Sequence, residues 1–368
     1  MSKLNFVEKL LQGVEVEWKP LGEVLTIKNG KDYKNFQTGS IPVYGSGGIM
    51  AYINTPVYDK PSVLIPRKGS LGNLYYVDVP FWTVDTVFWT VINTTIIEPK
   101  FVYYYLQTQH LEKFNMAGGV PSLTQTILNK VPFPIPCPDN PKKSLEIQAE
   151  IVRILDTFTE LTAELTAELT ARKKQYHYYR DQLLTFEEGE VEWKLLGNIA
   201  EILRGTAITE KETIPGEYQV VANGPSYNYY HNQNNRSGET IVIARSGAYA
   251  GLVSYWNIPI FLTDAFSIHP ENKVLVTKFL YYVLKRDQTK IHNMGKGAGV
   301  PHVRATEFES YKVPVPPLSE QERIVAILDK FDALTNSITE GLPREIELRQ
   351  KQYEYYRNRL LSFPRQEA

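Results

Sequence analysis

A helix-forming segment that occurs twice decides the fold: IQAEIVRILDTF at 147–158 and EQERIVAILDKF at 320–331. Seven further blocks repeat in the same order: VEVEWKPLG (14–22) with GEVEWKLLG (189–197), LIPRKGSLG (64–72) with VIARSGAYAG (242–251), WTVDTVF (82–88) with FLTDAFS (261–267), KFVYYYLQ (100–107) with KFLYYVLK (278–285), GGVPSLTQT (118–126) with AGVPHVRAT (298–306), KVPFPIPCP (130–138) with KVPVPPLS (312–319), and RKKQYHYYRDQLLTF (172–186) with RQKQYEYYRNRLLSF (349–363). So many blocks in the same order do not arise by chance, so the chain consists of two copies of one sequence unit.

The two halves agree to different degrees along their length. The helical blocks are nearly interchangeable, whereas the blocks before them share Gly, aromatic and Pro positions and differ in the polar residues between. This contrast predicts a common scaffold that presents two different recognition surfaces.

The repeat predicts the order domain, helix, domain, helix. We expect a first domain at 1–138, a central helix at 139–188, a second domain at 189–317 and a C-terminal helix at 318–368. Residues 20–135 and 195–316 contain short β-branched and aromatic runs bounded by Gly, Pro and Asn, which is typical of strands. The expected fold class is α+β: two globular domains separated by two long antiparallel coiled-coil helices, with a pseudo-twofold internal repeat.

Apolar residues in both helical segments recur in steps of 3, 4 and 7, which is the pattern of a coiled-coil seam. The residues expected to pair the helices are Ile151, Phe158, Leu165, Leu169, Tyr176, Ile324, Phe331, Ile338 and Tyr353. Gly341 and Pro343 predict a kink or break in the second segment. Ser319 followed by Glu322 resembles a capping box, and Ser144 with Ile147 a weaker cap.

The first helical segment repeats the word Thr-Ala-Glu-Leu at 162–165 and 166–169. Four added helical residues give about 6 Å of length and a net rotation of about 40°. One base pair of B-DNA gives about 3.4 Å of rise and about 34–36° of twist. The word is therefore a plausible length unit for a spacer between two DNA-reading domains; the alternative is slippage of a short repeat without a function.

Composition restricts the class of protein. The chain has 368 residues, 43% hydrophobic and 22% charged, with a formal net charge of −1 and one Cys. A single thiol forms no internal disulfide, and the charged N-terminus does not resemble a signal peptide, so we expect a cytoplasmic protein. The overall charge gives no signature of nucleic-acid binding, but the stretches 19–138 and 194–317 contain ten Lys and Arg against seven Asp and Glu, and thirteen against ten.

The duplicated ends KVPFPIPCPDNP…IQAEIVRILDTF and KVPVPPLSEQERIVAILDKF, with RKKQYHYYRDQLL and RQKQYEYYRNRLL, resemble the specificity subunit of type I restriction–modification enzymes. The match covers essentially the whole chain, and the Thr-Ala-Glu-Leu words resemble the subgroup that carries this element centrally. One departure is CPDNPKKSLEIQAE, where the second copy has PPLSEQERI, so the start of the first helix is less well defined.

The resemblance implies two target-recognition domains, each of which reads one half of a bipartite, asymmetric DNA site. It implies that the helices set the spacer and that two methyltransferase subunits and two restriction–translocation subunits assemble with the chain. The methyltransferase would bring S-adenosylmethionine and methylate adenine, the restriction subunits would use ATP and Mg, and the chain itself would bind no cofactor and no metal.

The residues that we expect to contact DNA are basic, amide, hydroxyl and aromatic side chains in Gly-rich loops, because Arg, Lys, Asn and Gln bind base edges or phosphate and Ser and Tyr commonly bind phosphate. They are Lys31, Tyr33, Lys34, Asn35, Arg67, Lys68, Ser70, Gln125, Arg204, Lys211, Arg236, Arg245, Ser246, Tyr249, His302 and Arg304. For each residue the alternative is a solvated loop side chain. For Arg67 and Arg245, which recur beside Gly at equivalent places, the alternative is a structural turn whose Arg bridges the sheet.

The sequence contains no recognised catalytic motif. A phosphate-binding loop, an H-E-x-x-H zinc motif and the Asn-Pro-Pro-aromatic tetrapeptide of adenine methyltransferases are missing. Asp85 and Asp264 occupy matching places and are interpreted as hydrogen-bonding scaffold residues. Two other classes stay open: a scaffold whose domains bind polypeptides or glycans, and an enzyme with an unrecognised hydrolytic site.

Overall fold

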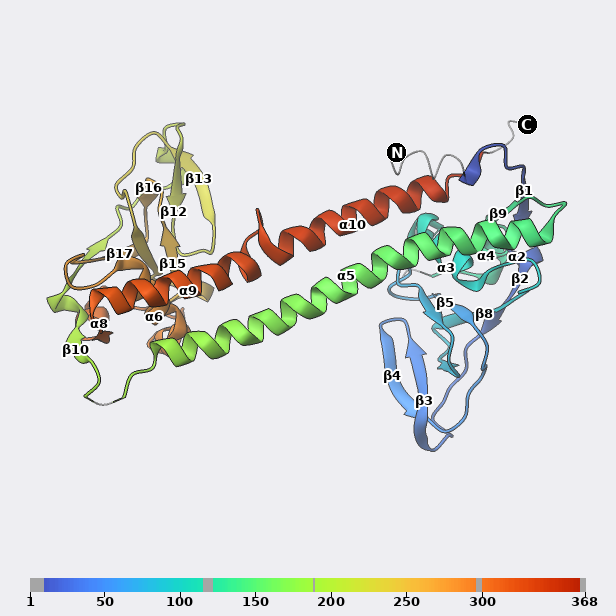
Figure 1. Ribbon diagram of the computed structural model, residues 1–368, viewed down its shortest axis with the longest axis horizontal. Coiled ribbons are helices and arrows are strands. Elements are labelled where there is room, and N and C mark those ends of the chain that lie inside the picture. Colours follow the sequence, from blue (N-terminus) through green and yellow to red (C-terminus); the bar gives the residue numbers. More distant parts are fainter. Residues whose placement is uncertain (1–9, 115–121, 188, 296–299, 365–368) are drawn as a thin grey trace. The chain divides into compact units, whose positions relative to one another are not determined.

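The computed structural model of the chain describes residues 10–114, 122–187, 189–295 and 300–364 (Figure 1). The chain divides into two compact units, one formed by residues 1–164 and 346–368 and the other by residues 165–345. Each unit therefore contains one globular domain together with part of each helical segment. The domain boundaries expected from the sequence stay predictions, because a division by compactness cuts through the helices.

In its described residues the first globular domain contains three sheets. The largest has the order β2 (Leu25–Asn29), β8 (Val87–Ile92), β5 (Ser62–Pro66), β6 (Tyr75–Val77), and all its pairs are antiparallel. The second sheet has the order β4 (Gly48–Ile53), β3 (Thr38–Gly45), β7 (Trp82–Thr83), with β3 and β7 parallel. The third pairs β1 (Val16–Pro20) with β9 (Pro132–Pro136). Helices α2 (Leu21–Val24), α3 (Pro99–Thr108) and α4 (Gln125–Leu128) and the 3-10 turn η1 (Leu111–Phe114) complete the domain.

The second globular domain repeats this topology strand for strand. Its sheets have the orders β11 (Ala200–Arg204), β17 (Ala265–Pro270), β14 (Thr240–Ala244), β15 (Val253–Trp256), and β13 (Tyr227–His231), β12 (Tyr218–Val221), β16 (Ile260–Leu262), while β10 (Glu192–Leu195) pairs with β18 (Lys312–Val315). The helices are α6 (Thr277–Arg286), α7 (Gln288–Asn293) and α8 (Ala305–Glu309), with 3-10 turns η2 (Leu196–Asn198), η3 (Glu210–Glu212) and η4 (Gly247–Tyr249). The expected α+β class is confirmed, as is the internal repeat.

The central strands β5 and β14 are buried along their whole length, which explains their continuous apolar sequence. In β5, Val63 and Ile65 pack into the cluster that holds Phe101 of α3, whereas Leu64 packs on the opposite side with Phe81 and Trp89. The strand period of two sends alternate side chains to opposite faces, so both faces of the strand are covered.

The two helical segments differ in continuity. Helix α5 runs unbroken over 44 residues, Pro141–Leu184, and includes both Thr-Ala-Glu-Leu words. The second segment is divided into α9 (Leu318–Asn336) and α10 (Gly341–Leu360), as the Gly and Pro predicted. Gly341 has φ +78°, and a Cβ there would lie 2.3 Å from the carbonyl oxygen of Ala333, so the turn requires Gly.

Helix-pairing residues are seen within each unit. In the first unit Phe158 stacks on Tyr356 of α10 with ring centroids 5.2 Å apart. In the second unit the ring of Phe331 of α9 lies 5.7 Å from that of Tyr179 and 6.3 Å from that of Tyr176. Ile151 and Ile324 are fully buried in the two main domain cores. Tyr353 packs against α3, where its hydroxyl donates to Gln107 Oε1 at 2.8 Å. Leu165 and Leu169 are half-buried.

Three expectations about the helices are wrong. Ile338 does not pair helices, because it lies in the break between α9 and α10 and is 80% exposed. Ser319 does not cap α9, because that helix begins at Leu318 and its N-cap residue is Pro317, which makes no side-chain cap. Ser144 lies inside α5, whose first turn is capped instead by the Asn140 side chain, which accepts from the Lys143 amide at 3.0 Å.

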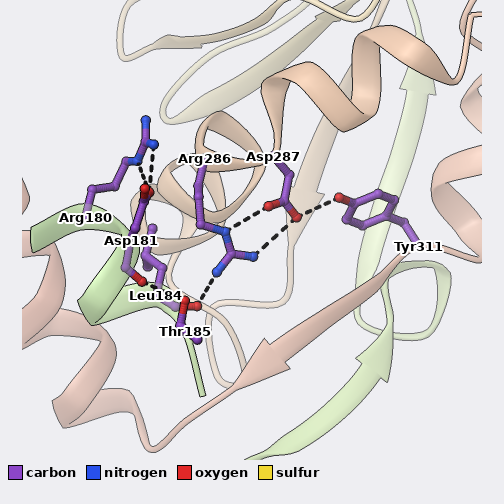
Figure 2. A network of polar contacts seen from close by, with 7 residues as sticks. All are labelled: Arg180, Asp181, Leu184, Thr185, Arg286, Asp287 and Tyr311. Carbon is purple, nitrogen blue, oxygen red and sulfur yellow. Dashed lines mark hydrogen bonds and ion pairs between the residues drawn. The ribbon is translucent and has the colours of Figure 1, made fainter. Parts of the chain in front are cut away.

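The end of α5 is fixed to the second domain by a polar network (Figure 2). Arg286, the last residue of α6, donates to the main-chain oxygen of Leu184, the last residue of α5. The same guanidinium group pairs with Asp287 at 2.8 Å, and Asp287 accepts from the Tyr311 hydroxyl at 2.7 Å. The carbonyl of Leu184 at the end of α5 has no partner within its own helix, and the Arg286 guanidinium group supplies its hydrogen bond.

Residues near the two ends of the described chain lie close together in the first unit. The indole nitrogen of Trp18 donates to the main-chain oxygen of Pro364 at 3.1 Å.

Candidate nucleic-acid interface

A pocket of about 860 Å³ in the second domain brings together four of the predicted DNA-contacting residues. It opens where β11 ends, where β17 begins and where α8 begins. The basic side chains that line it are Arg204, Arg245, His302 and Arg304, and the acidic ones are Glu212 and Asp264. All six are exposed. Residues from distant parts of the sequence therefore share one polar, open surface.

Arg245 is held by an ion pair within this pocket. Its Nη2 lies 2.7 Å from Asp264 Oδ1, and the two side chains are 47% and 46% exposed. Asp264 has φ +42°, an unusual conformation that Asp tolerates better than most residues, and it aims the carboxylate back across the turn.

Asn223 braces the same turn from a neighbouring loop. Its Nδ2 donates to Asp264 Oδ2 at 2.6 Å and to Ser246 Oγ at 3.0 Å. Its Oδ1 accepts from the main-chain amides of Arg245 at 2.6 Å and Ser246 at 3.2 Å. Both polar atoms of the Asn223 side-chain amide are therefore used to fix the Arg245 turn. Asp264 acts as the hydrogen-bonding scaffold residue that the sequence suggested.

The segment that carries His302 and Arg304 is fixed to this turn by the main chain. Val303 N donates to Arg245 O at 2.8 Å, and Ser246 forms an isolated β-bridge with His302. Arg304 then occupies the N-cap position of α8, where its amide donates to Glu307 Oε2 at 2.9 Å. These contacts place both side chains in the lining of the pocket.

Three other predicted residues of the second domain lie elsewhere. Lys211 is exposed in η3, and Tyr249 is 51% exposed at the end of η4. Arg236 is a structural residue: its Nε donates to Ser267 Oγ at 2.6 Å and its Nη2 to the main-chain oxygen of Arg204 at 2.8 Å. Burial lowers the pKa of Arg236. Its donors are engaged in bracing the edge of the sheet, which leaves it poorly placed to bind a ligand.

The first domain has a pocket of about 850 Å³ that collects fewer of the predicted residues. Tyr33 and Lys34 line it, together with Asp85 and the turn between β3 and β4. Lys31 and Asn35 are exposed nearby in the sequence, and the carbonyl of Lys31 accepts from Trp82 Nε1 at 2.8 Å. The loop is thus fixed by its backbone while Lys31, Lys34 and Asn35 are exposed, and Tyr33 is half-buried against a hydrophobic cluster that includes Trp82.

Arg67 and Arg245 occupy equivalent backbone positions, as the repeat predicted. Leu123 N donates to Arg67 O at 2.8 Å, and Lys68 forms a β-bridge with Ser122, which copies the arrangement around Arg245. The side chains differ. Arg67 lies over the Phe88 ring at 5.0 Å and donates to Asn29 Oδ1 at 3.5 Å, so it bridges the sheet.

Of the remaining predicted residues in the first domain, Gln125 is half-buried and its Nε2 donates to the main-chain oxygen of Ile27 at 3.2 Å, which ties α4 to β2. Lys68 and Ser70 are exposed. Within the described ranges there is no group of three or more His, Cys, Asp or Glu side chains that could hold a metal ion. No helix in the described part of the chain is long and apolar enough to cross a membrane.

A duplicated set of polar residues, which was not predicted from the sequence, joins each domain to its helix. Lys100 and Tyr104 of α3 contact Asp156 of α5 at 2.8 and 2.6 Å, and Lys278 and Tyr282 of α6 contact Asp329 of α9 at 2.8 and 2.5 Å. The buried Gln148 and Gln321 likewise bind main-chain groups at 96–98 and 274–276. The signal was available, since these residues recur at matching places in the aligned blocks.

Two copies of one α+β domain, each joined to a long helical segment and each presenting a polar pocket, define a class of two-headed recognition proteins. Both halves match the type I restriction modification DNA specificity domain, over residues 13–172 and 188–348. The chain therefore belongs to this family, and it is a DNA specificity subunit of a type I restriction–modification system.

Known relatives match over nearly the whole chain. The EcoR124I/EcoR124II specificity subunit of Escherichia coli is 41% identical over 409 aligned positions, which cover 100% of this chain and 99% of the relative. The EcoprrI specificity subunit of Escherichia coli is 34% identical, covering 92% and 93%. The fold resembles the crystal structure of a type I S subunit from M. genitalium with a TM-score of 0.69 at 18% identity, covering 97% and 98% of the two chains.

Proposed function

We propose that each globular domain reads one half of a bipartite, asymmetric DNA site. The observation that supports this is the contrast around Arg67 and Arg245. Both turns share a carbonyl hydrogen bond and an isolated β-bridge, but the Arg67 side chain lies over the Phe88 ring, whereas Arg245 is paired with Asp264 in a polar pocket. One scaffold with two different sets of side chains suits two different half-sites.

Binding of the full chain, in complex with its methyltransferase partner, to duplexes that contain or lack the site tests this proposal. Specific binding should weaken as salt rises, with a slope of about −0.9 per phosphate contact. Binding without any sequence preference would contradict the proposal. It would favour the alternative of a protein-interaction scaffold, for which we expect binding to polypeptides or glycans.

We infer that the helices set the length of the DNA spacer. The continuous helix over Pro141–Leu184 supports this, since Thr-Ala-Glu-Leu words within an unbroken helix change its length and phase by fixed amounts. The helices would then pair along their length as an antiparallel coiled coil, in the subgroup that carries this repeat.

We also propose that two methyltransferase subunits dock on the helices, with two restriction subunits completing the complex. A solved structure of similar fold, with a TM-score of 0.61 at 15% identity, comes from work on the assembly of the type I R-M system. In this chain the duplicated QYHYYR and QYEYYR segments expose the same Tyr in both copies, Tyr178 at 60% and Tyr355 at 49%. A surface that occurs twice suits two copies of one partner.

The docking proposal is tested by mass measurement of the complex. Tyr178→Ala and Tyr355→Ala should each weaken binding of one methyltransferase copy, and the double variant should weaken both. Lys173→Ala, an exposed change on the same helix, is the matched control. Full assembly of the double variant at the wild-type affinity would contradict the assignment.

The chain would contribute no catalytic group. In this proposal the methyltransferase brings S-adenosylmethionine and flips the target adenine out of the stack, the restriction subunits use ATP and Mg, and the complex works in the cytoplasm. The absence of recognised catalytic motifs from the sequence supports this division of labour.

A further inference from the structure

We propose that Arg245 reads a guanine in the half-site of the second domain, with Asp264 and Asn223 as positioning residues that fix the plane of its guanidinium group. This assignment rests on the proposed function of the domain. It goes further by naming the base, the residue that reads it and the residues that hold that residue in place.

The guanidinium group of Arg245 is held in a defined orientation. A bidentate contact to guanine O6 and N7 requires the guanidinium plane to be fixed before DNA arrives. Asp264 Oδ1 holds one edge of the guanidinium group at 2.7 Å, and Asn223 holds the other carboxylate oxygen at 2.6 Å. With the Arg245 side chain 47% exposed, N–H donors remain available toward the pocket.

The ion pair also decides between base and phosphate. The Asp264 carboxylate offsets the charge of Arg245 locally and would repel a phosphate group that approached the pair. A base edge carries no net charge and presents two acceptors in one plane. The ion pair therefore favours a guanine edge for Arg245. The exposed Arg204 and Arg304 in the same pocket are better suited to the phosphate backbone of the DNA.

Arg67 allows a comparison within the chain. The carbonyl of Arg67 is bonded as that of Arg245 is, but its amide donates to the main-chain oxygen of Thr86 at 2.9 Å. Its side chain lies 5.0 Å from the Phe88 ring and reaches Asn29. The backbone position alone does not present an Arg to a ligand. The first domain has Asp85 at the place that matches Asp264, so the difference lies in Asn223, which binds both Asp264 and the main-chain amide of Arg245.

The experiment uses the full chain in complex with its methyltransferase partner and a library of duplexes randomised in the half-site of the second domain. The wild-type complex should select a G·C pair at one position. Arg245→Ala and Arg245→Lys should both lower the preference for that pair by about 5- to 150-fold and leave the other positions unchanged. Arg245→Lys is informative because a Lys can still bind phosphate but does not form the planar double contact.

The variant Asp264→Asn distinguishes a role of Asp264 in positioning Arg245 from a role in folding. Asn tolerates the same backbone conformation and removes one negative charge. We expect several-fold weaker discrimination at the same base pair together with tighter binding to duplexes that lack the site, while the melting temperature stays unchanged. If Asp264 had only a structural role, Asp264→Asn would weaken binding both to duplexes that contain the site and to duplexes that lack it. Lys273→Ala, an exposed charge loss outside the pocket, is the control and should keep the base preference.

Two outcomes would overturn the assignment. If Arg245→Lys restores wild-type binding and Arg245→Ala weakens all duplexes alike, with a salt slope smaller by about one, the residue contacts phosphate. If the wild-type complex shows no base preference in this half-site, the proposed function of the domain fails, and the assignment fails with it.

Discussion

The hydroxyl group of Tyr282 donates a hydrogen bond of 2.5 Å to the carboxylate of Asp329, which joins α6 of the second domain to α9. Lys278 contacts the same carboxylate at 2.8 Å. The first domain repeats the arrangement with Tyr104, Lys100 and Asp156. These hydrogen bonds fix the orientation of each domain on its helix, because hydrogen bonds are directional and apolar packing alone is not.

We predict that Asp329→Ala lowers the free energy of unfolding by about 1–3 kcal/mol, because Tyr282 and Lys278 both lose a charged acceptor. The side chains of Lys278 and Asp329 are about a third exposed, so solvent screening places the effect toward the lower end. Urea unfolding of the full chain measures it. Glu322→Ala, on an exposed position of the same helix, should change stability much less; an equal loss in both variants would contradict a specific role for Asp329.

The network around Asp287 predicts a pH dependence (Figure 2). Burial alone would raise the pKa of Asp287, but hydrogen bonds from Arg286 and Tyr311 and the charge of Arg286 outweigh burial and hold the pKa below its ordinary value of 3.8. A carboxylate with a depressed pKa in the fold contributes stability above its unfolded pKa and loses it as pH falls through the folded one.

The test is Asp287→Asn, which should lower the free energy of unfolding by about 2 kcal/mol at neutral pH. The difference from the wild type should shrink below pH 3.8, as the wild-type carboxyl becomes protonated. Unfolding curves from pH 7 to pH 3 follow it. A difference that stays constant over this whole range would rule out the ionised form as the stabilising species.

Insertion of one more Thr-Ala-Glu-Leu word after Leu169 should lengthen the preferred DNA spacer by about one base pair and leave both half-sites unchanged. The rotation of about 40° nearly matches one base-pair step, whereas the rise overshoots by roughly 3 Å. Mapping of methylated adenines in cells that carry the full operon reads out the spacer. A changed half-site sequence would refute the role of the helix as a spacer.

Exchange of residues 195–316 for the corresponding part of another specificity subunit should change one half-site and preserve the other. The physical reason is that the Arg245 turn, its braces and the pocket all lie within this range. The same methylation mapping applies. Altered recognition in both halves would show that the domains do not read DNA independently.

Much of the architecture follows from the sequence alone, because a repeat and its hydrophobic period are local properties. The pairing of Gly341 with Pro343 predicted the break between α9 and α10, and the steps of 3 and 4 predicted the long helix. The helix starts were harder to predict from the sequence. Helix α9 follows Pro317 and helix α5 follows Asn140, whereas the sequence predicted caps at Ser319 and Ser144. The apolar Ile338 fitted the helical period but lies in the break, where it is exposed.

The sequence by itself determined the duplicated plan, the two helical segments and the placement of Arg67 and Arg245 at equivalent turns, since each depends on neighbours along the chain. Only the tertiary structure decided what those two arginines do. Whether a guanidinium group lies on Phe88 or pairs with Asp264 depends on which side chains distant strands bring within about 3–5 Å. Packing in three dimensions sets those distances, and no spacing in the sequence encodes them directly.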